Sequence, residues 1–530
     1  MSPRLRAGGI YEWELSPPAD QSLTVASAVQ LQGPSGQSMR LTGFADGEVA
    51  RVRLGPVLPG IWRWHTAADE HGAIEVEADA AAGWIPPLRF AANRRHLVHP
   101  DGKPFLWLAD TAWSIVFKGS SDEWGTYLDR RAKQGYSVLQ VTLLPWRWDW
   151  TDAERNRPFH NGDPTRPNTA YFRRYEQFLE MAAERGLVVC LMLIWGGPRP
   201  LLPAIHFSQA QAVEFARYAV SRFAAFPCVW SVSGDAEYIT ELAKWNAVGA
   251  VVEETDPYGR PTTNHLPPQM NWVGLHADAA WHDFHMIQTG HRESSVSDIA
   301  DLPAAYFKRT PTKGFVNGEP WYEAHPSRDT AEYGPTFTAY DARYAFWVSI
   351  LSGAGMGHTY GSQGIWNWKH TGDSEEEVAG PQIGPAWTAA LEHAGAAHCG
   401  LGANLLRSLP WWQLSPAPER VHLQPRPADP VRRPVCAIAE DATWLVYAPA
   451  ADGRLTLKGI PPLDWQAEWF DPRTGDRHHI GTVAPGTNHC WQAPPSPTPE
   501  DWLLVVTRAS ERRNCVLTPS ASSWTTSVSA

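Results

Sequence analysis

The pattern of hydrophobic and polar residues changes twice along the chain. From residue 10 to about residue 90, short runs alternate apolar and polar positions around turn residues, as in "ARVRLGPVLPGIWRWHTAA" and "GAIEVEADA". Alternation with a period of two predicts β-strands that bury one face. The same strand-and-turn pattern returns from about residue 406, in "TWLVYAP", "GRLTLKGI" and "DWLLVVTR". We therefore expect a β-sandwich on each side of a different central region.

Strands alternate with helical segments in that central region. The run "LVVCLMLIW" is apolar almost throughout, as expected for a strand that is buried on both faces. The preceding segment "AYFRRYEQFLEMAAERG" carries apolar residues at helical spacing and ends at a glycine, a common helix stop. Repeated strand–helix units of this kind predict a parallel sheet.

Eight such strands are predicted from the sequence. They cover residues 104–110, 137–146, 187–195, 228–235, 260–265, 283–291, 313–319 and 355–361. Eight strands with intervening helices predict a (β/α)₈ TIM barrel. The resulting division of the chain is a β-sandwich over 1–90, the barrel over 91–405, a second β-sandwich over 406–510 and a disordered Ser/Thr-rich tail over 511–530.

Composition narrows the classes of function. The net charge of -11, without a basic stripe, argues against a nucleic-acid partner. The six cysteines form no CxxC pair, so neither a zinc ribbon nor a dense disulfide framework is indicated. The N-terminus lacks the apolar run of a secretory signal and no later stretch could span a bilayer, so we expect a cytoplasmic protein without a membrane partner. The sequence predicts no cofactor and leaves homo-oligomer formation open.

Two acidic residues close predicted strands of the barrel. Glu319, in "GFVNGEPWYE", ends the seventh strand, and Pro320 disfavours helical geometry for it. Asp235 ends the fourth strand. Because the active site of such a barrel forms at the C-terminal ends of its strands, these side chains are expected to face one mouth. Paired carboxylates about 5 to 5.5 Å apart, one an acid and one a nucleophile, suit glycoside hydrolysis with retention.

Other readings of these carboxylates remain open. Each is alternatively a solvated strand-end residue or a helix cap. Glu237 lies two residues beyond Asp235 and is the rival acid.

Further strand ends supply candidate sugar contacts. Polar groups there would bind hydroxyls, and aromatic faces would stack on sugar rings, for which a chain with 28 tryptophans is well supplied. The candidates are Asp110, Trp113, Trp146, Arg147, Trp195, His265, Gln288, His291, Tyr322, His358 and Tyr360. Three of them have alternative, purely structural roles: Asp110 as a turn cap, Arg147 as a surface partner of Asp149, and Trp195 as a residue that closes the barrel.

Two histidines in "WHDFH" raise the question of a metal site. His282 and His285 are three residues apart on a predicted strand, so their side chains are expected to point to opposite faces. We therefore predict no metal site.

Four segments carry a family resemblance: "DGKPFLWLADTAW", "VWSVSGD", "GFVNGEPWYE" and "GMGHTYGSQGIWNW". They are similar to the apiosidase-like barrel family, glycoside hydrolase family 140 and its relatives. The flanking "GEVARVRLGPVLPGIWRWHT" and "WFDPRTGD" resemble the β-sandwiches that accompany such barrels. The resemblance implies that Asp235 is the acid/base and Glu319 the nucleophile. The Asn-Glu pair usual on strand four of the larger clan is replaced here by Gly234-Asp235.

Three functions remain in competition. The first is a retaining glycosidase that cleaves a terminal sugar, an apioside or another furanoside or pyranoside, from a small glycoside or oligosaccharide. The second is a metal-dependent hydrolase on the same fold, which should show an HxH pair at the first strand, where this chain has "ADTAW". The third is a non-catalytic carbohydrate-binding barrel. A carbohydrate is the expected partner in the first and third.

Overall fold

The computed structural model describes most of the chain, in two compact units, Met1–Asn404 and Leu405–Ala530. The described residues are 3–16, 22–55, 58–80, 83–196, 201–236, 240–268, 278–329, 335–373, 384–450, 453–486 and 488–509. Two predictions lie outside them, the rival acid Glu237 and the tail over 511–530. Among the described residues, no helix has both the length and the apolarity needed to cross a membrane.

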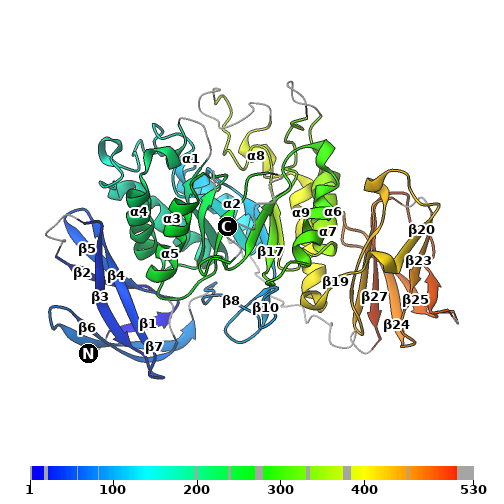
Figure 1. Ribbon diagram of the computed structural model, residues 1–530, viewed down its shortest axis with the longest axis horizontal. Coiled ribbons are helices and arrows are strands. Elements are labelled where there is room, and N and C mark those ends of the chain that lie inside the picture. Colours follow the sequence, from blue (N-terminus) through cyan, green and yellow to red (C-terminus); the bar gives the residue numbers. More distant parts are fainter. Residues whose placement is uncertain are drawn as a thin grey trace, which may run out of the picture. The chain divides into compact units, whose positions relative to one another are not determined.

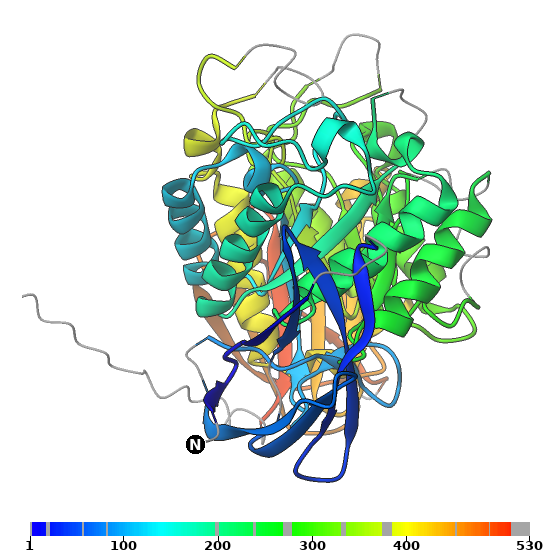
Figure 2. The same cartoon turned by 90° about the vertical axis from the view of Figure 1, so that its left-hand side faces the viewer.

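The N-terminal strands form one seven-stranded sheet with the order β1-β7-β6-β3-β4-β5-β2. The strands are β1 Arg4–Ala7, β2 Tyr11–Leu15, β3 Thr24–Gln32, β4 Ser38–Asp46, β5 Val49–Leu54, β6 Gly60–Thr66 and β7 His71–Ala80. The Trp13 ring on edge strand β2 contacts the Trp64 ring on β6, with centroids 5.6 Å apart. Because three strands separate β2 from β6, this contact requires the sheet to fold over on itself as a sandwich. Figure 2 shows its long, twisted blue strands.

The central strands close into a parallel barrel in sequence order, which confirms the predicted TIM barrel (Figure 1). They are β11 Trp107–Thr111, β12 Val138–Thr142, β13 Val188–Trp195, β14 Cys228–Gly234, β15 Thr262–His265, β16 His285–Gln288, β17 Phe315–Glu319 and β18 Gly357–Tyr360. The first strand is shorter than expected: Pro104–Phe105 forms β10 in a separate small sheet with β9 Leu97–Val98 and β8 Arg89–Phe90.

Helices follow the barrel strands and cover them. They are α1 Ile115–Lys118, α2 Ser121–Lys133, α3 Thr169–Glu184, α4 Gln209–Phe223, α5 Leu242–Thr255, α6 Asp298–Phe307, α7 Ala339–Leu351, α8 Trp387–Ala390 and α9 Ala394–Arg407. Local sequence fixes several starts. Ser120 with Glu123 forms a capping box at α2, and Ser208 with Gln211 forms one at α4, so the first free backbone N–H groups of each helix are satisfied.

The second unit contains two further sheets. The six-stranded sheet runs β19-β21-β22-β27-β24-β25 and the three-stranded sheet runs β20-β23-β26. Their strands are β19 Ser415–Pro416, β20 Val421–Gln424, β21 Val435–Ala439, β22 Thr443–Ala448, β23 Arg454–Lys458, β24 Trp465–Phe470, β25 Arg477–Val483, β26 Cys490–Gln492 and β27 Trp502–Arg508. Leu457 of the smaller sheet and Trp444 of the larger share one buried core, so the predicted β-sandwich is present.

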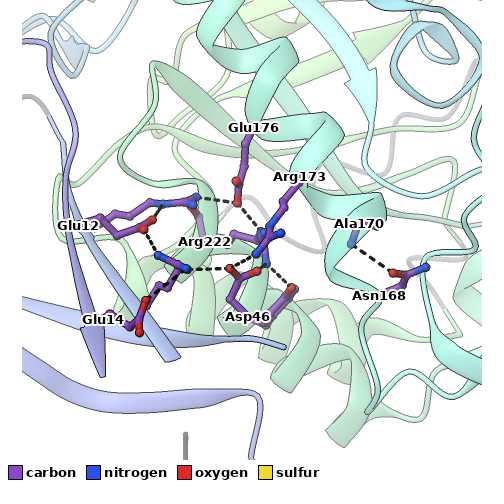
Figure 3. A network of polar contacts seen from close by, with 11 residues as sticks. Glu12, Glu14, Asp46, Asn168, Ala170, Arg173, Glu176 and Arg222 are labelled. Atoms are coloured by element: carbon purple, nitrogen blue, oxygen red, sulfur yellow. Dashed lines mark hydrogen bonds and ion pairs between the residues drawn. The ribbon is translucent and has the colours of Figure 1, made fainter. Parts of the chain in front are cut away.

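A buried ionic network joins the N-terminal sheet to the barrel within the first unit (Figure 3). Asp46 on β4 contacts Arg222 of α4 at 3.0 Å and Arg173 of α3 at 2.9 Å. Arg222 also contacts Glu176 of α3 at 2.6 Å, and Arg53 of β5 reaches the same Glu176 oxygen at 2.7 Å. Burial opposes ionisation of Asp46, but the arginines outweigh it and hold its pKa below the usual value.

Removing the carboxylate at the centre of this network should destabilise the first unit. In Asp46→Ala, the fully buried Arg222 guanidinium loses a partner, which costs about 3 to 5 kcal/mol when a buried ion pair is broken on one side. Glu14→Ala is the matched control, since Glu14 is largely exposed and its contact with Arg51 contributes about 0 to 1 kcal/mol. Calorimetry should show a lower unfolding temperature for Asp46→Ala alone; equal effects of both changes would contradict the assigned role.

Candidate active site

Glu319 is the last residue of β17, and its side chain is only 10% exposed. Its strand is held from inside the barrel by Gln140 of β12, whose Nε2 donates to the Gly318 carbonyl at 3.0 Å while its Oε1 accepts from Thr359 at 3.0 Å. Sequence reasoning missed Gln140. A single amide between the apolar residues of "VLQV" was the available signal.

Asp235 follows β14 directly and has a left-handed backbone, with φ of +45°. Such a conformation is strained for a residue with a side chain, is best tolerated by Asn and Asp, and concentrates at functional sites. The preceding residue, Gly234, has no room for a side chain, because a Cβ there would lie 2.4 Å from the Trp195 ring. Trp195 thus occupies the space that a larger residue at position 234 would need, which accounts physically for glycine at this position where the larger clan has Asn.

His265, the last residue of β15, lies between the two carboxylates. Its Nδ1 is 3.3 Å from Asp235 Oδ1 and its Nε2 is 3.2 Å from Glu319 Oε2. The ring is fully buried, whereas the Asp235 side chain is 32% exposed. His265 was expected as a sugar contact; the structure places it between the two acids, and its contact with a sugar stays a prediction.

A second histidine contacts the other carboxylate oxygen of Glu319. His291 Nε2 lies 2.9 Å from Glu319 Oε1, and an ionised carboxylate only accepts, so this nitrogen carries the proton. The His291 ring stacks on His325 at 4.3 Å and packs against Tyr322 at 4.4 Å. His325 was also missed from the sequence, although it lies only six residues beyond Glu319.

The pKa values of the two carboxyl groups move apart. Burial, aided by the charge of Glu319, raises the pKa of Asp235 in spite of the opposing His265. Burial would raise the pKa of Glu319 too, but its close contacts with His265 and His291 outweigh burial and hold that pKa far below its usual value. Burial lowers the pKa of His265, whereas its contacts with both acids raise it more, to about 9. At neutral pH the site therefore contains an ionised Glu319 beside an imidazolium, with Asp235 the more readily protonated acid.

Indole rings surround this group on one side. Trp113 and Trp195 lie 5.6 and 5.5 Å from the His265 ring and 5.2 Å from each other. Trp146 packs on Trp195 at 4.2 Å and donates from Nε1 to Ser114 at 2.8 Å. These predicted residues come together, and an apolar wall lowers the local dielectric around the charged groups.

Gln288 also lies at the site. It pairs in register with Glu319 on the neighbouring strand, and it is buried. Among the described residues its side-chain oxygen has no hydrogen-bond partner, which leaves that oxygen available to a ligand hydroxyl.

Asp110 and Tyr360 belong to a different, buried cluster. Asp110 Oδ2 accepts from Arg131 of α2 at 2.6 Å and from Tyr127 at 2.7 Å. Tyr360 donates to Glu323 at 2.7 Å. Because Asp110 Oδ2 and the Tyr360 hydroxyl are held by α2 and by the segment after β17, these contacts favour a structural role, although the buried Asp110 Oδ1 has no hydrogen-bond partner among the described residues.

Arg147 and His358 are also engaged away from the two acids. Arg147 forms two hydrogen bonds with Asp149, at 2.9 and 3.0 Å, which is the surface pair considered from the sequence. His358 contacts the Phe346 ring of α7 at 5.5 Å, and burial lowers its pKa to about 3.

The expectation that the His282 and His285 side chains point to opposite faces is wrong. Their side chains meet, with His282 Nε2 3.0 Å from His285 Nδ1. The physical reason is that β16 begins only at His285, so His282 lies in the preceding turn and strand alternation does not apply. Within the described ranges, no group of three or more His, Cys, Asp or Glu side chains is arranged to hold a metal ion.

The bridging imidazole leads to a prediction about pH dependence. His265→Gln removes the cation that lowers the pKa of both acids, so both pKa values should rise. The acid limb of kcat/KM, set by Glu319, and the basic limb, set by Asp235, should both shift to higher pH, with a loss of about 10- to 100-fold at the original optimum.

A matched variant separates the two limbs. His291 contacts Glu319 directly, so His291→Gln should move mainly the acid limb. A pH–rate profile of His265→Gln with unmoved or downward-shifted limbs would contradict the bridging role.

Residues 91–413 match the family described as "Apiosidase-like, catalytic domain". The chain belongs to this family. Residues 428–507 are similar to a family described as "Putative collagen-binding domain of a collagenase". A search of curated proteins found no match.

Solved structures share the fold of this family member. A structure titled "Glycoside hydrolase" is 22% identical, with a TM-score of 0.71, covering 80% of this chain and 97% of its own. A glycoside hydrolase family 5 protein from Bacteroides vulgatus is also 22% identical, with a TM-score of 0.72, covering 81% of this chain and 96% of its own. At this identity the likeness concerns the fold. The family assignment makes the apiosidase-like protein a glycoside hydrolase.

Proposed function

We propose that this apiosidase-like protein is a retaining glycosidase in which Glu319 is the nucleophile and Asp235 the acid/base. The observation that carries the proposal is the single imidazole of His265 between the two acids, with pKa values displaced in opposite directions. A nucleophile has to be ionised and an acid protonated at the same pH, and this arrangement favours both.

The proposed first step breaks the glycosidic bond. Glu319 attacks the anomeric carbon as Asp235 gives its proton to the leaving oxygen, and a covalent glycosyl-enzyme forms. Esterification removes the negative charge of Glu319. Because that charge is one of the causes that raise the pKa of Asp235, its loss makes Asp235 a stronger acid, and Asp235 remains as the ionised carboxylate.

In the proposed second step, Asp235 acts as a base. It takes a proton from water, the water attacks the anomeric carbon from the side that the leaving group vacated, and Glu319 is released as a carboxylate. His265 lies within 3.3 Å of both acids and would keep their orientation throughout.

The proposed substrate is a small glycoside or oligosaccharide with a terminal apiose-like furanose or another small sugar. The family description supports this class, and the tryptophan wall, Gln288 and His291 would contact the sugar. Four further sugar contacts stay predictions: Asp110, Arg147, His358 and Tyr360. The contacts that these side chains make in the structure argue against such a role.

A panel of aryl furanosides and pyranosides, aryl apioside included, tests this proposal. We expect release of the aryl alcohol from at least one terminal furanoside by the wild-type chain and not by Glu319→Ala. Hydrolysis that survives in Glu319→Ala would overturn the catalytic assignment, and the stereochemical course of the best substrate tests retention.

A further inference from the structure

The outer face of the N-terminal sheet carries two aligned rows of polar side chains. One row crosses four neighbouring strands through Arg40, Gln30, His65 and His71, which are direct cross-strand partners. Directly opposed residues on paired strands share a face. The register therefore places two imidazole rings and an amide next to an arginine along one line.

The second row lies two residues further along each strand. Its members are Ser38, Gln32, Arg63 and Ala73, again in register. Side chains two apart along a strand point to the same face, so both rows share it. The intervening row points the other way: its Trp64 packs against Trp13 inside the sandwich. The polar face is thus the outer one, and Arg40 and Arg63 are exposed on it.

This face is hollowed. The rows and the residues between them line a depression of about 690 Å³, within the size range of sites for small molecules. No acidic side chain of the described chain lines it. The nearest carboxylate on this face of β7, Glu75, is paired with Arg4 at 3.3 Å.

The two arginines have no ion-pair partner among the described residues. In a chain with a net charge of -11, a hollow with two unpaired guanidinium groups and no carboxylate is complementary to an anion. Guanidinium groups bind carboxylates through two parallel hydrogen bonds. The Gln30 and Gln32 amides and the Ser38 hydroxyl offer the donors and acceptors that sugar hydroxyls need.

We propose that this hollow of the N-terminal sheet binds an acidic oligosaccharide, with uronate carboxylates on Arg40 and Arg63 and hydroxyls on Gln30 and Gln32. A sugar is favoured over nucleic acid because two arginines are far short of the basic stripe that a polyphosphate requires. Holding an acidic glycan on this sheet would raise the local concentration of its chain ends for the glycoside hydrolase on the same polypeptide.

Calorimetric titration of the full chain tests the proposal. The parent is Glu319→Gln, so that no sugar is turned over, and the probes are α-1,4-linked trigalacturonic acid and the neutral galactotriose of the same linkage. We expect binding of the acidic trisaccharide, weakened by added salt, and at least tenfold weaker binding of the neutral one. Equal affinity for both probes, or no binding of the acidic one, would overturn the proposal.

Variants locate the binding. Arg40→Ala with Arg63→Ala should weaken binding about tenfold for each guanidinium lost, and the corresponding Lys pair should fall between it and the parent. Arg6→Ala with Arg89→Ala removes the same charge from exposed positions outside the hollow and should bind like the parent. An unchanged affinity in the Ala pair, or an equal loss in the control pair, would contradict the site.

The binding proposal and the catalytic proposal can be tested independently of each other. In an otherwise wild-type chain, the Arg40→Ala and Arg63→Ala changes should leave hydrolysis of a small neutral aryl glycoside unchanged, because neither residue belongs to the barrel mouth. A parallel loss of that hydrolysis would show that the changes act through the fold and not through a ligand site.

Discussion

Glu319→Gln is expected to lower kcat by roughly 10⁴-fold or more without loss of the fold. The amide has the size of the carboxylate and keeps one oxygen to accept from His265 or His291, but it has no ionised oxygen to attack the anomeric carbon. Steady-state kinetics and the unfolding temperature of the purified variant measure the two effects. Turnover close to that of the wild type would rule Glu319 out as nucleophile.

Glu323 offers a matched control for this change. It is a buried glutamate only four residues away, and it accepts from Tyr360 at 2.7 Å and from the Gly395 N–H at 2.9 Å. Glu323→Gln should therefore lower stability by about 1 to 3 kcal/mol while kcat per folded molecule stays near the wild-type value. The contrast separates loss of chemistry from loss of structure.

Asp235→Ala is expected to slow hydrolysis of each substrate in proportion to how much its leaving group needs a proton. Glycosides with poor leaving groups should lose about 10²- to 10⁴-fold in kcat/KM, because the departing oxygen no longer receives a proton. Activated aryl glycosides should lose far less in the bond-breaking step. A series of aryl leaving groups of graded pKa measures this dependence.

Glu237→Ala is the comparison that decides the identity of the acid. If Asp235 is the acid, Glu237→Ala should follow the wild-type dependence on leaving group. A steep dependence in Glu237→Ala, or an equal loss for all leaving groups in Asp235→Ala, would transfer the role away from Asp235.

The strand order and the positions of Asp235 and Glu319 at strand ends could be predicted because their signals are local. Several barrel strands, such as Val188–Trp195, are marked by apolar runs, and the barrel topology places the C-terminal ends of all eight strands at one mouth. Asp235 directly follows the fourth strand, and Glu319 is the last residue of the seventh. Their convergence around His265 therefore needed no knowledge of side-chain contacts, although the left-handed backbone of Asp235 was not foreseen.

For the other strand-end residues, the side of the strand to which the side chain points could not be predicted in this way. All five residues of β11 are buried, since one face meets the barrel interior and the other meets the helices. No polar alternation then marks the side to which Asp110 points, and only the structure reveals its partner Arg131 on α2. The same holds for Tyr360 and His358 on β18, where the burial pattern is equally uniform.

The most direct test of the account is the anomeric configuration of the first product. Proton NMR of the anomeric signals during the first minutes of hydrolysis, before mutarotation, shows which anomer is released. Attack by Glu319 followed by attack of water inverts the centre twice, so the account predicts a product with the configuration of the substrate. The opposite anomer appearing first would contradict the retaining mechanism and the role of Glu319 as nucleophile.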